Sequence, residues 1–228
     1  MIDPPRPVFS FRAELPGGTF LANSDRWLED VKAAVGETAE MVDSVLGEFE
    51  LSGYELIVAD RECLFDSLVG DAFPDWGGAV AIPALNRIVL KSPMISSTDK
   101  PFSSLVAHEY AHLAIHAALA GRAAPRWLDE GLATYLAGDW SYRDFVAITI
   151  AAWRVRFVPL ARLRRLNTFD EKTARLAYAE SYLAIKHLID YYGVESVRAL
   201  IASLRDGLTV DDALRETIGA NLDGFQTE

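Results

Sequence analysis

The sequence predicts an α+β protein in which a small sheet with a backing helix precedes a helical lobe. Segments with strand character lie within the first hundred residues, and helical periodicity dominates from Pro101 onward. This segregation favours α+β over an alternating α/β arrangement. We expect the 228 residues to form one domain, with a sheet lobe at 1–100 and a helical lobe at 101–228.

In the first half, short apolar segments alternate with turn residues. Ser24 is suited to cap a long helix whose apolar positions recur with the helical period. Glycine and proline near 16–18 and 83–86 mark turns. The expected elements are a strand at 8–13, the capped helix at 24–49, a strand at 54–59, a short helix at 63–69, and a hairpin of 76–82 with 87–91.

The second half is predicted to be mostly helical. One long helix ends at Gly121, and the next has Pro125 near its first turn, where proline is tolerated. The expected helices are 102–120, 126–137, 142–155, 171–192, 194–204 and 210–218.

The net charge and the length of the apolar segments argue against nucleic-acid binding and against a membrane span. The net charge is −11, so nucleic-acid binding is not expected, and the basic cluster at 162–165 is small enough to be a solvated loop. No apolar segment reaches transmembrane length, so no membrane span is expected in this chain.

The sequence supports only a default assignment of the cellular compartment. Cys63 is the single cysteine, which excludes an intrachain disulfide and a cysteine metal site. Residues 1–5 lack a basic region followed by an apolar core, so no signal peptide is expected. The default is a cytoplasmic protein, or an exported one if a signal was removed.

Two histidines four residues apart carry the main chemical signal. On a helix, His108 and His112 lie on one face, one turn apart, where both imidazoles can bind one metal ion. Glu109 can reach a metal-bound water without being a ligand. His116 continues the row, but a straight helix carries it about 5.4 Å further. We therefore expect it outside the ligand set.

Glu130 is the best third ligand. A catalytic zinc ion needs three protein ligands and an open position. Glu130 follows His112 by eighteen residues, and Gly121 and Pro125 allow the chain to reverse between the two helices. The predicted zinc ligands are therefore His108, His112 and Glu130.

These residues resemble a known family. His-Glu-x-x-His at 108–112 followed by Trp-Leu-x-Glu-Gly-x-Ala at 127–133 resembles the gluzincin metallopeptidases, and most of all the small peptidase MA-like proteins. The segments at 76–79, 87–90, 178–182 and 191–193 extend the likeness over roughly residues 70–195. The resemblance implies a zincin (thermolysin-like) fold, with residues 1–228 as a single metallopeptidase domain.

The resemblance also implies a mechanism and a substrate. One Zn²⁺ ion would activate water, Glu109 would act as general base, and a peptide or protein would be cleaved. Tyr178 and Tyr182, four residues apart on one predicted helix, are candidates to stabilise the oxyanion, with core packing as the alternative role. His187 falls off their face and is a weaker candidate.

The sequence departs from the family pattern in two places. Thermolysin-like sites carry an acid four residues after the ligand glutamate, where this chain has Thr134, so Asp129 or Asp139 would have to replace it. Clan aminopeptidases bind the substrate amine through an acidic Gly-x-Met-Glu-Asn segment, and residues 77–81 have no such acid. This favours endopeptidase-like cleavage.

Two alternatives remain open from the sequence. One is a zinc-binding, weakly active or inactive peptidase-like domain with a regulatory or cell-envelope partner. The intact His108, Glu109, His112 and Glu130 argue against a dead site. The other is a zinc hydrolase that acts on a non-peptide amide.

Overall fold

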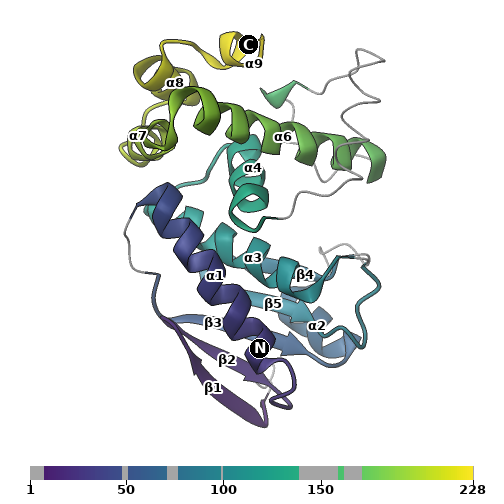
Figure 1. Ribbon diagram of the computed structural model, residues 1–228. Coiled ribbons are helices and arrows are strands. Elements are labelled where there is room, and N and C mark those ends of the chain that lie inside the picture. Colours follow the sequence, from purple (N-terminus) through teal and green to yellow (C-terminus); the bar gives the residue numbers. More distant parts are fainter. Residues whose placement is uncertain are drawn as a thin grey trace, which may run out of the picture. The chain divides into compact units, whose positions relative to one another are not determined.

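The chain folds into two compact units. The computed structural model describes residues 8–47, 51–70, 77–98, 100–138, 159–161 and 171–227. Unit 1 comprises Met1–Ala39 with Glu50–Leu113, and unit 2 comprises Glu40–Phe49 with Ala114–Glu228. Unit 1 contains the sheet and unit 2 is helical wherever the structure describes regular elements, so the α+β prediction is confirmed (Figure 1).

Unit 1 is built on a five-stranded mixed sheet of order β1-β2-β3-β5-β4. The pairs β1–β2 and β4–β5 are antiparallel, whereas β2–β3 and β3–β5 are parallel. The short strand β4 is therefore one edge of the sheet. The elements that begin in this unit are β1 (Phe11–Leu15), β2 (Gly18–Ala22), α1 (Leu28–Leu46), β3 (Tyr54–Ala59), α2 (Glu62–Val69), β4 (Ala79–Ile82), β5 (Arg87–Lys91) and α3 (Phe102–Ala118).

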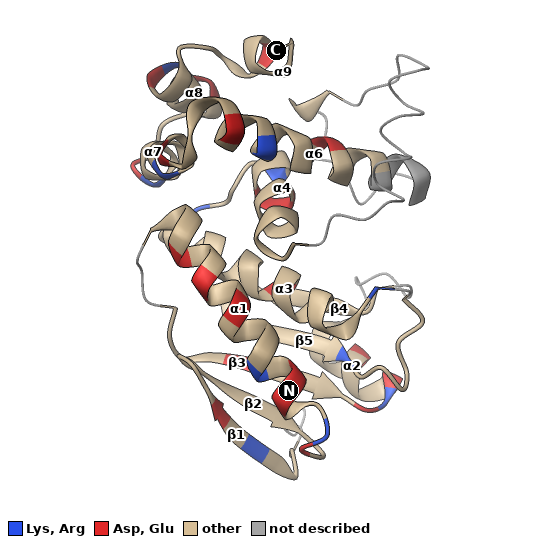
Figure 2. Ribbon diagram, in the orientation of Figure 1, with Lys and Arg blue, Asp and Glu red and all other residues tan. Residues whose placement is uncertain are grey.

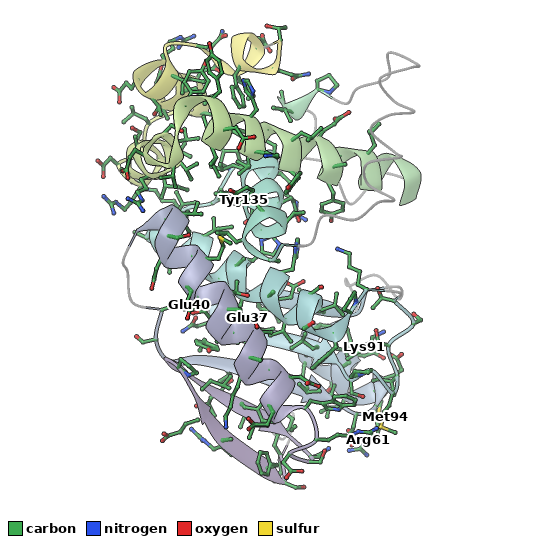
Figure 3. The ribbon with its side chains drawn as sticks, viewed as in Figure 1. Glu37, Glu40, Arg61, Lys91, Met94 and Tyr135 are labelled. Atoms are coloured by element: carbon green, nitrogen blue, oxygen red, sulfur yellow. The ribbon has the colours of Figure 1, made fainter. Side chains whose placement is uncertain are left out.

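Helices cover both faces of this sheet. Phe65 of α2 packs on Ala59 and Val89, which point to one face of the sheet. On the same face Lys91, labelled in Figure 3, lies 4.9 Å from the Phe65 ring centre and pairs with Glu62 at 2.8 Å. Tyr54 points to the opposite face, where its ring lies 5.6 Å from that of Tyr110 in α3. Packing on β3 thus places α3 against the sheet.

Unit 2 is a set of packed helices. Its helices beyond α3 are α4 (Arg126–Leu136), α6 (Glu171–Tyr192), α7 (Val194–Arg205), α8 (Val210–Ile218) and α9 (Leu222–Thr227). Among the described helices of this unit, α4 and α6 form the most extensive contact. Phe225 of α9 reaches back to Trp127 of α4, with 5.8 Å between the ring centres. Among the described residues, no helix is both long and apolar enough to cross a membrane.

Most predicted elements are confirmed, and four features differ from the prediction. The first strand lies at Phe11–Leu15 rather than 8–13, and strand β2 was not predicted. Ser24 does not cap α1, because the helix begins at Leu28 after a turn closed by the Leu28 amide and the Asp25 carbonyl. Helix α9 was not predicted either. The predicted helix at 142–155 and the basic cluster at 162–165 lie outside the described residues.

Candidate metal centre and catalytic residues

Helix α3 presents the two predicted histidine ligands together. Val106, Ala107, Tyr110 and Ala111 are buried, which leaves half-buried His108 and His112 on another face of the helix. The two Nε2 atoms lie 3.2 Å apart, and the ring planes are almost perpendicular, at 85°. The α-helical repeat therefore brings one nitrogen of each ring to a common point.

The separation of the two nitrogens fits one zinc ion. Zinc binds imidazole nitrogen at about 2.0–2.1 Å, in tetrahedral geometry with ligand angles near 109°. Two such nitrogens would lie about 3.3 Å apart, and the observed distance is 3.2 Å. The separation of the two nitrogens is thus compatible with two imidazole ligands of one zinc ion.

Glu109 is held at the edge of the sheet. Its Oε2 accepts a 2.6 Å hydrogen bond from the Ala81 amide in β4. The Lys91 amide donates to the Gly78 carbonyl, which sets the pairing so that the backbone groups of Ala79 and Ala81 point away from β5. The free edge of β4 therefore orients the carboxylate of the predicted base.

Glu130 is a buried carboxylate on α4. Its exposed fraction is 3%, and its Oε1 lies 2.9 Å from Nη2 of Arg126, one turn earlier on the same helix. Figure 2 shows basic and acidic bands along α4. The helix starts at the Pro125 carbonyl, which accepts from the amides of Leu128 and Asp129.

Gly131 allows the helix that carries Glu130 to approach α6 closely. A Cβ on Gly131 would lie 2.3 Å from the Ser181 carbonyl oxygen and 2.7 Å from Cγ1 of Ile185. Only a residue without a side chain fits this contact. The glycine that follows Glu130 in the sequence therefore has a structural role.

The two candidate tyrosines lie on α6, one turn apart. Tyr182 packs on Tyr135 of α4, labelled in Figure 3, with 6.1 Å between ring centres. Burial raises the pKa of Tyr182, although nearby Lys186 acts in the opposite direction. Tyr178 is half-buried. Tyr182 thus has a packing role in unit 2.

The remaining residues considered from the sequence lie in packing or ion-pair contacts where the structure describes them. His187 belongs to an aromatic cluster, with Tyr191 stacked at 5.6 Å and Phe225 at 5.9 Å. Thr134 is buried, and Asp129 lies 4.0 Å from Arg126. Asp139 and Trp76 lie outside the described residues.

Sequence reasoning missed two groups near the predicted site residues. Arg126 stands four residues before Glu130, and this spacing on a helix is a recognisable ion-pair signal. The Ala81 amide carries no sequence signal, because any residue in that position of the edge strand would supply it.

The fold and these residues define a class of protein, an α+β protein with a helix-borne histidine pair suited to a metal ion and a carboxylate beside it. The family comparison is more specific. The model of the Peptidase MA superfamily matches residues 56–228, and the chain belongs to this superfamily. Membership supports a zinc peptidase-like role, and this match extends beyond the 70–195 resemblance expected from the motifs.

Two solved structures are similar to the chain at low identity. One is a variant of an M1 zinc metallopeptidase from Deinococcus radiodurans with a Tyr-Ser-Ala substrate, at 14% identity and a TM-score of 0.45, covering 92% of this chain and 46% of that one. The other is a variant of a two-domain M1 zinc metallopeptidase bound to L-tryptophan, at 13% identity and a TM-score of 0.46, covering 96% and 50%. The chain spans about half the length of both proteins. No curated protein matches the sequence.

Proposed function

We propose that this chain is a zinc-dependent peptidase that cleaves internal peptide bonds. The observation that carries the proposal is the 3.2 Å separation of the His108 and His112 Nε2 atoms, with Glu109 between them in the sequence and anchored on β4. Membership of the Peptidase MA superfamily supports the reaction class. We propose further that residues 1–228 form a single metallopeptidase domain with a thermolysin-like fold.

Glu130 is proposed to complete the ligand set. Together with His108 and His112 it supplies two imidazole nitrogens and one carboxylate oxygen, a donor set that suits catalytic zinc. A carboxylate at 3% exposure is costly to bury, and binding a cation offsets that cost. The spacing of the sequence motif supports the same assignment.

The proposed mechanism assigns the proton transfers to Glu109. When bound, zinc would polarise the scissile carbonyl and lower the pKa of a water molecule. The Ala81 amide holds Oε2 of Glu109, so Oε1 is the oxygen that takes the proton from the attacking water. Glu109 then delivers this proton to the leaving amine. Tyr178 and Tyr182 are the two candidates for the oxyanion donor, and Tyr182 also packs on Tyr135.

The substrate is proposed to be an extended peptide. The outward-facing backbone groups of Ala79 and the carbonyl of Ala81 on the edge strand β4 can pair with an added strand, while the Ala81 amide holds Glu109. Such pairing recognises the backbone more than the side chains. Residues 77–81 contain no acid to hold a free amine, which supports endopeptidase-like rather than aminopeptidase cleavage.

The test uses a peptide-library digest together with zinc analysis. Glu109→Gln should keep one zinc ion per chain and lose about 10²- to 10⁴-fold in rate, because only the base is removed. His112→Gln and Glu130→Gln should lose zinc. His116→Gln is the matched control on the same helix and should behave like the wild type.

Two outcomes would contradict the proposal. Full hydrolysis by Glu109→Gln would exclude Glu109 as the base. If the wild-type protein binds zinc but cleaves no peptide, the result would favour the alternative of a zinc-binding, inactive peptidase-like domain.

A further inference from the structure

The ion pair between Arg126 and Glu130 differs from the other helical ion pairs that the structure describes. The Glu130 side chain is 3% exposed and that of Arg126 is 39% exposed. In α8, by comparison, Arg215 and Asp212 are 53% and 56% exposed. Exposed pairs contribute little because water screens them, whereas a charge next to a buried carboxylate is screened much less. The Arg126 contact can therefore determine the orientation of the Glu130 side chain.

Both members of the ion pair lie on one helix. Arg126 and Glu130 are four residues apart on α4, and Nη2 meets Oε1 at 2.9 Å. The backbone next to them packs closely on α6, where Gly131 lies against the Ser181 carbonyl. With the helix packed in this way, the direction of the Glu130 carboxylate depends on its side-chain rotamer, and the guanidinium restrains that rotamer.

A carboxylate that is paired with arginine can also bind a metal ion. A carboxylate has two oxygens with about four lone-pair sites in total, so it can accept from arginine and bind a cation at the same time. Partners that orient metal ligands in this way tune metal affinity. Asp129, 4.0 Å from Arg126, places further negative charge beside the guanidinium.

We propose that Arg126 is a positioning residue that holds the Glu130 carboxylate correctly directed for zinc. The inference rests on the proposed function, since it requires Glu130 to be a zinc ligand. It adds a residue that acts through that ligand without touching the metal or the substrate. Removing Arg126 should weaken zinc binding, whereas an arginine that merely competes with zinc for Glu130 would produce tighter binding when removed.

The experiment measures zinc affinity by competition with a chromophoric chelator, with zinc alone as the probe. Arg126→Ala should bind zinc about 10- to 100-fold more weakly than the wild type, the usual range for partners of metal ligands. Arg126→Lys keeps the charge but loses the planar fork, so it should recover part of the affinity. Arg215→Ala removes an exposed helical ion pair in α8 and should leave zinc affinity unchanged.

Each variant is first checked for wild-type helicity by circular dichroism. If Arg126→Ala does not fold, Arg126→Lys decides the question. This variant should bind zinc at least about threefold more weakly than the wild type, a smaller loss than the one expected for Arg126→Ala. Zinc affinity equal to or tighter than that of the wild type overturns the positioning role. Failure of the proposed function has a different signature, because wild-type protein would then bind no zinc or Glu130→Gln would bind it normally.

Discussion

Replacing Gly131 with alanine would place a methyl group against the backbone of α6. The new Cβ would lie 2.3 Å from the Ser181 carbonyl oxygen and 2.7 Å from its carbonyl carbon. Because the obstacle is backbone, rotation of a side chain cannot relieve the contact. One helix must move by about 1 Å to restore an ordinary contact distance.

The expected destabilisation follows from two opposing effects. Overpacking costs about 1–3 kcal/mol, and a rigid backbone obstacle favours the upper end of that range. Alanine in a helix interior regains about 1 kcal/mol relative to glycine. The free energy of unfolding should therefore fall by about 2 kcal/mol, which lowers the urea midpoint by about 0.7 M if the slope is about 3 kcal/mol/M.

The matched control is Gly36→Ala in α1. A Cβ at Gly36 would meet nothing within 4 Å, so only the gain in helix propensity remains. This variant should be about 0.5–1 kcal/mol more stable than the wild type. Urea unfolding followed by circular dichroism in the presence of chelator measures both variants without a contribution from metal binding. A Gly131→Ala protein as stable as Gly36→Ala would refute the close α4–α6 contact.

Two further predictions concern tyrosines. Burial first, and then Tyr110, raise the pKa of Tyr54, whose hydroxyl donates to the Pro16 carbonyl at 3.0 Å. The unfolded chain loses this proton near pH 10, whereas the folded protein keeps it, so the stability that is present below pH 10 declines above it. Tyr54→Phe should lower the free energy of unfolding by about 1 kcal/mol at pH 8 and should flatten this decline. If urea unfolding between pH 8 and 11 shows the same pH dependence of stability in both proteins, the effect is excluded. If one of the two candidate tyrosines donates to the oxyanion, its replacement by phenylalanine should lower kcat by about 10²- to 10³-fold, whereas replacement of the other should lower it less than about tenfold; Tyr178→Phe and Tyr182→Phe are compared in the peptide assay. A loss of less than about tenfold in both variants would exclude an oxyanion role for either tyrosine.

Local features of the site could be predicted because they depend on neighbours in the sequence. The spacing of His108 and His112 places both on one helical face whatever the rest of the chain does, and the structure brings their Nε2 atoms to 3.2 Å. The bounds of α8, predicted as 210–218, match the structure because its cap and apolar repeat are local. Arg126 was equally predictable, since it precedes Glu130 by one helical turn.

Strand pairing was harder to predict, because it depends on residues far apart in the chain. Strand β2 is only five residues long, and its parallel pairing with β3 joins Phe20 to Leu56. Ser24 has the residue type of a helix cap, but the Asp25 turn moves the start of α1 to Leu28. Residue preference alone could not decide either outcome.

The sequence by itself identified the side chains proposed to carry the chemistry, namely the histidine pair, Glu109 between them, and Glu130 in its own helix. Tertiary structure alone decided how two of them are held. The Ala81 amide reaches Glu109 only because the register of β4 on β5 turns it to the free edge of the sheet. Likewise, α4 has its place on α6 only because Gly131 admits the Ser181 carbonyl. The helical repeat is a local property of the backbone, whereas register and close approach arise from contacts between distant segments.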